Sequence, residues 1–325
     1  MSMSRTRQCL IAFAVTTSLA MVAVAVLKTD VVDEKPAKEI KTVALATQDP
    51  DRSFQIQAMP DRFTSYEAMR ETMKSWASSA PEISEFAAYG RTSLGTCVNY
   101  LRVGTRDKPK VLIQSGISSD EEFGILANLK LAERILSNFG KDEAVTWLVR
   151  NRDIYFVPVV SPDNFLQSNL VEGKDPESSF PCLSKLNPKS PSTVKLLMDF
   201  VQKQKFSASL NFHTYGEHFS LPTNAHEKDT MAMGKIAQRM ADLSGYRLQR
   251  KQGAGNPSDL DWLYSSGCFS VDVMLGSNDR KYVAYSEVES SMDRLYDSLA
   301  LFIREAPESS ISPVPLPSVH FYQGE

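Results

Sequence analysis

An α/β sandwich around a largely parallel or mixed sheet is the fold class that this sequence predicts. Short apolar runs of strand length, such as 111–116 and 153–160, alternate along the chain with segments of helical periodicity, such as 192–203. This alternation favours a sheet covered by helices. The chain has 325 residues, of which 42% are hydrophobic, so it can bury one large core or two modest ones.

The first residues predict a targeting segment that is separate from the fold. Arg5 and Arg7 precede an apolar run at 9–27, and Lys28 closes it. This charge layout is typical of a signal peptide or a signal anchor at residues 1–28. The run is close to the roughly 20 residues that span a bilayer, so both forms stay open. Either form predicts the secretory pathway. The domain is then expected outside the cytoplasm, either secreted or anchored to the membrane by one spanning segment.

Three further regions follow the targeting segment. Residues 29–60 are expected to be a flexible linker, because Lys, Asp, Glu, Ala, Thr and Gln dominate them and their periodicity is weak. Residues 61–306 are expected to form the ordered domain. Residues 307–325 are expected to be an extended, Pro-rich tail.

The domain is predicted to begin with a helix and then to alternate between strands and helices. The first helix starts near Phe63 and has an amphipathic pattern. The helix that follows the strand at 111–116 has an acidic first turn, as the helix dipole favours. The remaining predicted elements are strands at 86–94, 97–103 and 153–160, a helix at 192–203, a strand that ends at His213 and a closing helix at 286–305.

His213 stands at the end of that short apolar run, beside a turn at Gly216. Strand ends are where α/β proteins hold catalytic and binding side chains. A histidine there can ligate a metal through its neutral imidazole, with Glu217 and His218 as sequence neighbours. It can also be a structural residue that hydrogen-bonds a backbone carbonyl. One histidine does not define a metal site, so further ligands must come from elsewhere in the chain.

Nucleotide and nucleic-acid binding have no support in the sequence. The formal net charge is -3 and the signs are mixed, so no basic patch is present to attract nucleic acid. Neither GxxxxGK[ST] nor GxGxxG occurs, which removes the usual nucleotide signatures. The absence of a GxSxG turn leaves a serine hydrolase without a motif.

Six short segments carry a resemblance to a known family. They are 89–93, 111–116, 157–165, 181–182, 211–216 and 261–267. Their order and spacing resemble those of the zinc carboxypeptidases similar to carboxypeptidase A, from about Phe63 to Ala306. The resemblance implies an α/β/α sandwich around a mixed sheet of about eight strands. It also implies a peptidase site in which two His and one Glu bind zinc, another Glu is the general base, and arginines bind the terminal carboxylate of the substrate.

The resemblance places Glu121 at the Glu ligand position and His213 at the second His ligand position. Ser118 falls where the first His ligand is expected, and none of the four histidines precedes His213. A serine hydroxyl is a poor zinc ligand beside imidazole, so Glu121 and His213 alone are expected to hold zinc weakly. Three residues stay open as a third ligand: Asp120, Glu122 and His218.

The positions of the base and of the substrate-binding arginines also depart from the family. Residues 269–273 resemble the strand that presents the catalytic Glu in the family, with Asp272 in its position. Aspartate has one methylene less, and misplacement on the order of 1 Å can cost about 100-fold in rate. A buried structural Asp is the alternative. Between Phe165 and Cys182, where the family carries its arginines, this chain has no Arg and has Lys174 as its only cation. Lysine attracts a carboxylate as a point charge without forming a bidentate pair.

Two hypotheses about function follow. The first is a catalytically impaired pseudoenzyme that binds a peptide or a protein C-terminus through the former active-site cleft. The second is an active, divergent zinc metallocarboxypeptidase that uses Glu121, His213 and a third ligand, with Asp272 as base. A thiol enzyme that pairs Cys268 with His213 is a weaker alternative, because burial of a structural cysteine is the commoner arrangement. Membrane contact is expected only through the N-terminal apolar segment.

Overall fold

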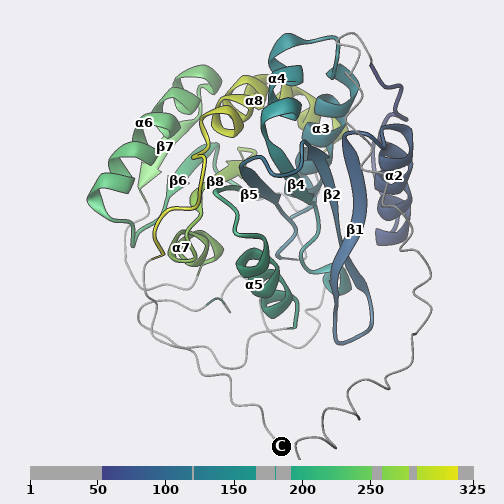
Figure 1. The fold of residues 1–325 in the computed structure, drawn as a ribbon, viewed down its shortest axis with the longest axis horizontal. Coiled ribbons are helices and arrows are strands. Elements are labelled where there is room, and N and C mark those ends of the chain that lie inside the picture. Colours follow the sequence, from purple (N-terminus) through teal and green to yellow (C-terminus); the bar gives the residue numbers. More distant parts are fainter. Residues whose placement is uncertain are drawn as a thin grey trace, which may run out of the picture. The chain divides into compact units, whose positions relative to one another are not determined.

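The computed structural model describes residues 53–118, 121–165, 180, 192–250, 258–277 and 284–313. Within these ranges one mixed sheet of eight strands carries helices on both faces, which confirms the predicted α/β/α sandwich (Figure 1). The apolar run at 9–27 lies outside the described ranges, as do Asp120, Lys174 and Cys182. No helix in the described part of the chain is long and apolar enough to cross a membrane.

The sheet has the strand order β1-β2-β4-β3-β5-β8-β6-β7. Its strands are β1 (Ser84–Arg91), β2 (Cys97–Gly104), β3 (Lys110–Gln114), β4 (Asp153–Val157), β5 (Ala208–Thr214), β6 (His218–Leu221), β7 (Arg247–Arg250) and β8 (Phe269–Leu275). The central strands β4, β3, β5 and β8 are parallel, whereas β2 and β6 join them antiparallel. The carboxyl ends of the four parallel strands therefore meet at one edge of the sheet, where α/β proteins place their sites.

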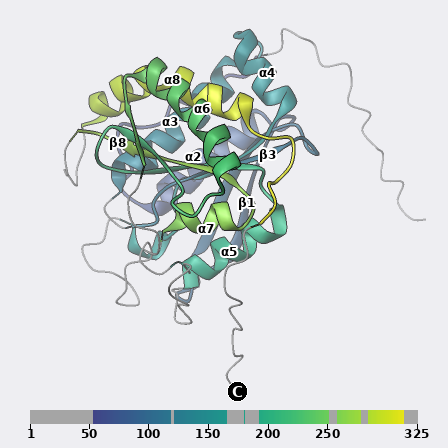
Figure 2. The same ribbon diagram turned by 90° about the vertical axis from the view of Figure 1, so that its left-hand side faces the viewer.

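Helices α5 and α7 cover one face of the sheet, and α3, α6 and α8 cover the other, as Figures 1 and 2 show. The helices are α2 (Tyr66–Ser79), α3 (Glu122–Asn138), α4 (Glu143–Asn151), α5 (Ser192–Gln204), α6 (Glu227–Ser244), α7 (Asp259–Ser265) and α8 (Tyr285–Glu305). A 3-10 turn spans Pro162–Asn164. Helices α4, α6 and α7 and strands β6 and β7 are not among the elements expected from the sequence.

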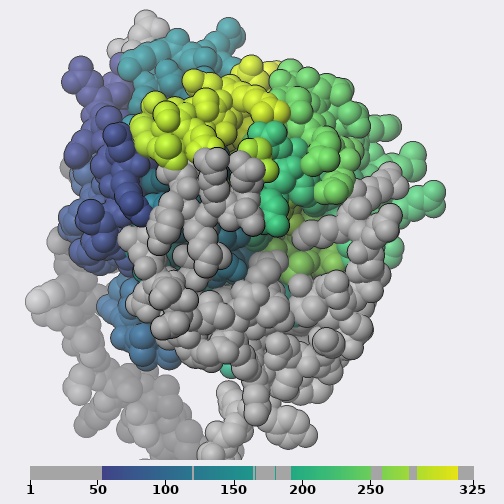
Figure 3. Space-filling view, turned by 180° about the vertical axis from the view of Figure 1, so that it is seen from behind, coloured from purple at the N-terminus to yellow at the C-terminus, as the bar shows by residue number. Residues whose placement is uncertain are grey.

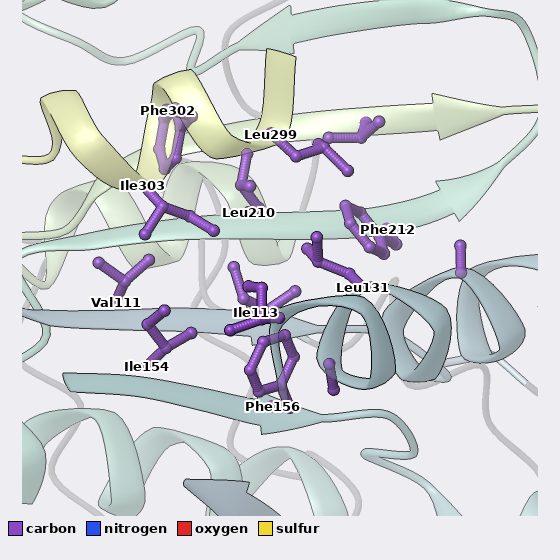
Figure 4. Close-up of a cluster of buried hydrophobic side chains, with 14 of the residues drawn as sticks. Val111, Ile113, Leu131, Ile154, Phe156, Leu210, Phe212, Leu299, Phe302 and Ile303 are labelled. Atoms are coloured by element: carbon purple, nitrogen blue, oxygen red, sulfur yellow. The ribbon is translucent and has the colours of Figure 1, made fainter. Parts of the chain in front are cut away.

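The main apolar core lies between the sheet and the helices α3 and α8 (Figure 4). Alternate residues of three central strands point to this face: Val111, Ile113, Ile154, Phe156, Leu210 and Phe212. Each of these side chains is fully buried. Burial of apolar surface stabilises a fold by roughly 25 cal/mol per Å², so this layer holds the central strands, and the loops that follow them, in place.

The ordered domain begins earlier than the expected boundary at residue 61. Phe54 and Met59 are only 6% and 4% exposed, and both belong to the main core. The indole Nε1 of Trp76 donates to the backbone carbonyl of Gln57 at 2.6 Å. Residues 53–60, expected to end a flexible linker, therefore pack against the domain. The average composition of the segment is polar, so it gave no sign that two individual apolar residues, Phe54 and Met59, are buried in the core.

The domain also extends beyond the expected boundary at Ala306. The backbone N–H of Ile311 donates to the carbonyl of Gly267 at 2.9 Å. Gly267 has φ +99, and a Cβ there would lie 2.8 Å from the carbonyl oxygen of Ile311, so the close approach requires glycine. In Figure 3 the yellow C-terminal part of the described chain lies at the surface, between the purple N-terminal part and the green segments.

Candidate functional site

The loop between β3 and α3 brings the predicted ligand Glu121 to the carboxyl edge of the sheet. Gly116 in this loop has φ +61, and a Cβ there would meet the carbonyl oxygen of Pro158 at 2.8 Å. Gly124 lies in the first turn of α3, where a Cβ would lie 2.9 Å from the carbonyl oxygen of Phe212. Gly116 thus lets the loop pass close to the chain that follows β4, and Gly124 lets the start of α3 approach β5, which places Glu121 beside the end of that strand.

Glu121 and His213 are in direct contact. The side chain of His213 is buried, and its Nδ1 lies 2.6 Å from Oε1 of Glu121. The second oxygen of Glu121 accepts hydrogen bonds from the backbone N–H groups of Ile117, at 3.1 Å, and Ser118, at 3.3 Å. The structure therefore brings together the two residues that the sequence suggested as metal ligands. Both carboxylate oxygens of Glu121 are engaged by protein groups.

The other nitrogen of His213 faces two aspartates. Nε2 lies 3.2 Å from Oδ2 of Asp259 and 3.9 Å from Oδ1 of Asp272. Both aspartates are fully buried. The three groups offer ligand atoms that all lie within 4.8 Å of one another. The imidazole ring of His213 thus separates Glu121 on one side from Asp259 and Asp272 on the other.

A row of buried polar side chains lies under the histidine. Strand register pairs Gln114 with Asn211, Asn211 with Asp272 and Asp272 with Ser220, so the row crosses β3, β5, β8 and β6. Gln114 Nε2 donates to Oδ2 of Asp259 at 2.8 Å, and Asn211 Nδ2 donates to Oδ1 of Asp272 at 3.0 Å. All of these side chains are fully buried. Because strand residues alternate between faces, the row lies opposite the apolar core.

The carboxylates around His213 control its charge. Burial disfavours the imidazolium and lowers the pKa of His213, but the negative charges of Glu121 and Asp259 outweigh burial and raise that pKa well above its usual value. Each ring nitrogen lies within hydrogen-bond distance of a carboxylate oxygen, Nδ1 of Glu121 and Nε2 of Asp259, so both carboxylates favour the charged form of the ring.

The residues left open as a third ligand are used elsewhere or fall outside the described ranges. Glu122 Oε1 accepts from the Nε of Arg62 at 3.1 Å. Nδ1 of His218 lies 3.1 Å from the carbonyl oxygen of Gly216. Asp120 lies outside the described ranges. The described contacts thus give neither Glu122 nor His218 a place beside Glu121.

The described residues do not complete a zinc site on the Nδ1 side of His213. Glu121 and His213 supply two donor atoms, and these atoms contact each other at 2.6 Å. Ser118, which the resemblance places at the first His ligand position, has only a neutral hydroxyl to offer. Catalytic zinc sites hold the ion with three side-chain ligands and keep one position open for water. The donor set on this side falls one ligand short of that requirement.

Asp272, the candidate base, lies below His213 on the polar row and is fully buried. Its role as a base stays a prediction, because the buried carboxylate has no exposed oxygen to support that role.

The thiol alternative is contradicted by the position of Cys268 in the sheet. Ala208 pairs with Phe269, and Thr214 pairs with Leu275. Cys268 is therefore at the amino end of β8, roughly 20 Å along the strands from His213. Burial also raises the pKa of its thiol to about 12, so the thiol is protonated at neutral pH.

Asp259 is the residue of this site that sequence reasoning did not select. It is the first residue of α7, after the N-cap Ser258, whose side chain accepts from the backbone N–H of Asp261. An aspartate in a first helical turn is common because it complements the helix dipole, so the local pattern carried no functional signal. Its link to His213 joins residues 46 positions apart and depends on how α7 lies over β5 and β8.

Comparison with known proteins agrees with the fold. Residues 69–169 match the family model described as zinc carboxypeptidase. The chain is similar to mouse carboxypeptidase A4, with 26% identity over 249 residues that cover 62% of this chain and 59% of that protein. It is similar to human carboxypeptidase D, with 26% identity over 167 residues that cover 46% of this chain and 12% of that protein. The chain spans just over half the length of the carboxypeptidase A relatives that it matches.

Solved structures share the fold at low sequence identity. The structure of bovine thrombin-activatable fibrinolysis inhibitor aligns with a TM-score of 0.66 and 16% identity, covering 76% of this chain and 98% of that one. The crystal structure of carboxypeptidase A from Helicoverpa armigera aligns with a TM-score of 0.65 and 17% identity, covering 76% and 74%. Together with the eight-stranded sheet, these similarities show that the chain contains a zinc metallocarboxypeptidase-like domain.

Proposed function

We propose that this domain is a catalytically impaired relative of the zinc carboxypeptidases that binds peptides or protein C-termini at the carboxyl edge of its sheet. The direct contact between Glu121 and His213, at 2.6 Å, carries the proposal. In a working site these two residues need a third ligand, and the resemblance to the family assigns that position to Ser118. The pair instead satisfies its own hydrogen bonds and has no complete donor set for a catalytic ion among the described residues.

The surroundings of Asp272 support the same proposal. A general base must reach the proton that it abstracts, directly or through one water. Asp272 is fully buried and one of its oxygens accepts from Asn211. It lies two residues deeper in the sheet than His213, because Asp272 pairs with Asn211, two positions before His213. A water at the edge of the sheet is therefore beyond the direct reach of this carboxylate.

An aromatic side chain at the same edge suits a binding role. Tyr215 follows β5 directly and is 52% exposed, which is unusual for a large side chain in this domain. Exposed tyrosine offers apolar contact area with a hydrogen-bonding tip, and such residues are enriched at binding surfaces. A peptide held there would contact Tyr215 while its end approaches the loop of Ser118. Because of the apolar segment at 9–27, the proposal also assigns this peptide binding to a location outside the cytoplasm.

Peptide hydrolysis and peptide binding, measured in parallel, test this proposal. The full chain is mixed with a peptide library that has free C-termini, in the presence of added Zn²⁺. We expect no release of C-terminal residues above the rate of the His213→Ala variant, and we expect binding that weakens at least several-fold in Tyr215→Ala. Zinc-dependent release that His213→Ala abolishes would show an active divergent peptidase and overturn the proposal.

A further inference from the structure

The contact between Glu121 and His213 has the geometry of an orienting hydrogen bond. A histidine that ligates a metal through one ring nitrogen usually donates the N–H of the other nitrogen to a carboxylate, which fixes the tautomer and the ring orientation. Nδ1 of His213 lies 2.6 Å from Oε1 of Glu121, and backbone amides hold the other oxygen of Glu121 in place. This arrangement presents Nε2, the opposite nitrogen, as the ligand atom.

The groups that face Nε2 are suitable ligands. Oδ2 of Asp259 lies at 3.2 Å and Oδ1 of Asp272 at 3.9 Å, and the candidate ligand atoms of all three residues lie within 4.8 Å of one another. Ligand atoms around a zinc ion at about 2.0 to 2.2 Å in tetrahedral geometry are separated by roughly 3.3 to 3.6 Å. The cluster is therefore close to the size that one ion requires.

Unpartnered oxygen atoms beside this cluster are a second and independent sign of a ligand. Gln114 and Asn211 direct their amide groups at the cluster, since each donates an N–H to one of the two aspartates. In the described structure the amide oxygens Oε1 of Gln114 and Oδ1 of Asn211 have no hydrogen-bond partner, although both side chains are fully buried. A buried acceptor without a partner is costly and calls for an ion or a water.

We propose that His213 Nε2, Asp259 and Asp272 form a buried site for a divalent first-row cation such as Zn²⁺, with Glu121 as the residue that orients the histidine. This site lies across the imidazole ring from the position at which the carboxypeptidase family holds its zinc. An imidazole nitrogen with two carboxylates favours Zn²⁺ over Mg²⁺ and Ca²⁺, which prefer ligand sets made only of oxygen. Binding replaces the Nε2 proton, which is released to solvent.

The cation at this site is structural. Asp259 comes from α7, Asp272 from β8 and His213 from β5, so one ion ties together three elements. Both aspartates are fully buried, so neither carboxylate exposes the bound ion to solvent. The inference goes beyond the proposed function, since it assigns the domain a metal without restoring peptidase chemistry. Hydrolysis tests the proposed function and metal content tests this inference, so the two can fail separately.

Metal content and thermal stability of the full chain test the inference. The protein is loaded with Zn²⁺, dialysed and analysed for zinc, and its melting temperature is measured with and without a chelator. We expect about one equivalent of retained zinc and a fall in melting temperature on the order of 5 °C when it is removed. Absence of both the retained zinc and the shift would overturn the inference.

Two matched variants locate the ion on one side of the ring. Asp259→Asn removes a ligand charge, and zinc affinity is expected to fall at least 10-fold. Glu121→Gln keeps an oxygen that accepts from Nδ1–H, and zinc is expected to be retained. The opposite pattern, with zinc lost in Glu121→Gln and kept in Asp259→Asn, would place the ion at the family position and contradict the inference. If Asp259→Asn does not fold, loss or retention of zinc in Glu121→Gln alone decides between the two positions.

Discussion

The two faces of strand β5 differ in how they are stabilised. Leu210 and Phe212 point into the core beside α3 and α8, where contact partners need only be apolar and of suitable size. Asn211 and His213 point to the other face, where each polar atom needs a particular partner from another element. The comparison teaches that the apolar face tolerates exchange of similar side chains, whereas the polar face depends on individual atoms and therefore carries the chemistry.

Truncation on the apolar face is expected to have the largest effect on stability. Phe212 is fully buried in the main core. We expect Phe212→Ala to lower the free energy of unfolding by about 3–5 kcal/mol, because it removes apolar burial and leaves a cavity. Urea denaturation measures the change, and Phe212→Leu is the control that keeps most of the volume. An equal loss in both variants would show that this face is more specific than the comparison allows.

Truncation on the polar face is expected to lower the free energy of unfolding by a smaller amount. The size of the loss should depend on whether the remaining partner keeps another hydrogen bond. Asn211→Ala removes the donor to Oδ1 of Asp272, and we expect a loss of about 1–3 kcal/mol in the free energy of unfolding. Ser209→Ala, two residues earlier on the same face, is the matched control. Ser209 contacts Ser270 at 2.7 Å, and Ser270 also donates to the carbonyl of Cys268, so it keeps a partner. A loss in Ser209→Ala as large as in Asn211→Ala would refute the dependence on single partners.

The smallest effect is expected where β5 has ended. Tyr215 is 52% exposed, so Tyr215→Ala should change the free energy of unfolding by at most about 0.5 kcal/mol. The affinity of the Tyr215→Ala variant for peptides should nevertheless fall several-fold if the proposed binding surface is correct. Denaturation and peptide titration of the same preparation separate the two quantities. A destabilisation above about 2 kcal/mol would show that the ring supports the fold and would remove it as evidence for binding.

The sequence predicted the apolar face well and the polar face in part. The short apolar runs at 111–116 and 153–160 indicated central strands, because a strand that is buried on both faces leaves a continuous apolar run in the sequence. Glu121 and His213 were found together because family motifs carry them, although they are 92 positions apart. Asp259, Gln114 and Asn211 were not selected, since their roles depend on strand register and on the placement of α7. Those relations join distant segments and leave no local pattern.

The measurement that tests the central claim most directly is zinc-dependent release of C-terminal residues from peptides by the full chain, compared with Ser118→His. The resemblance to the family places Ser118 at the first of the two His ligand positions. Ser118→His would supply a third side-chain donor beside Glu121 and His213. We predict no release by the unmodified protein above the rate of His213→Ala, and tighter zinc binding on the Nδ1 side in Ser118→His. Release by the unmodified protein that depends on zinc, His213 and Glu121 would contradict the account.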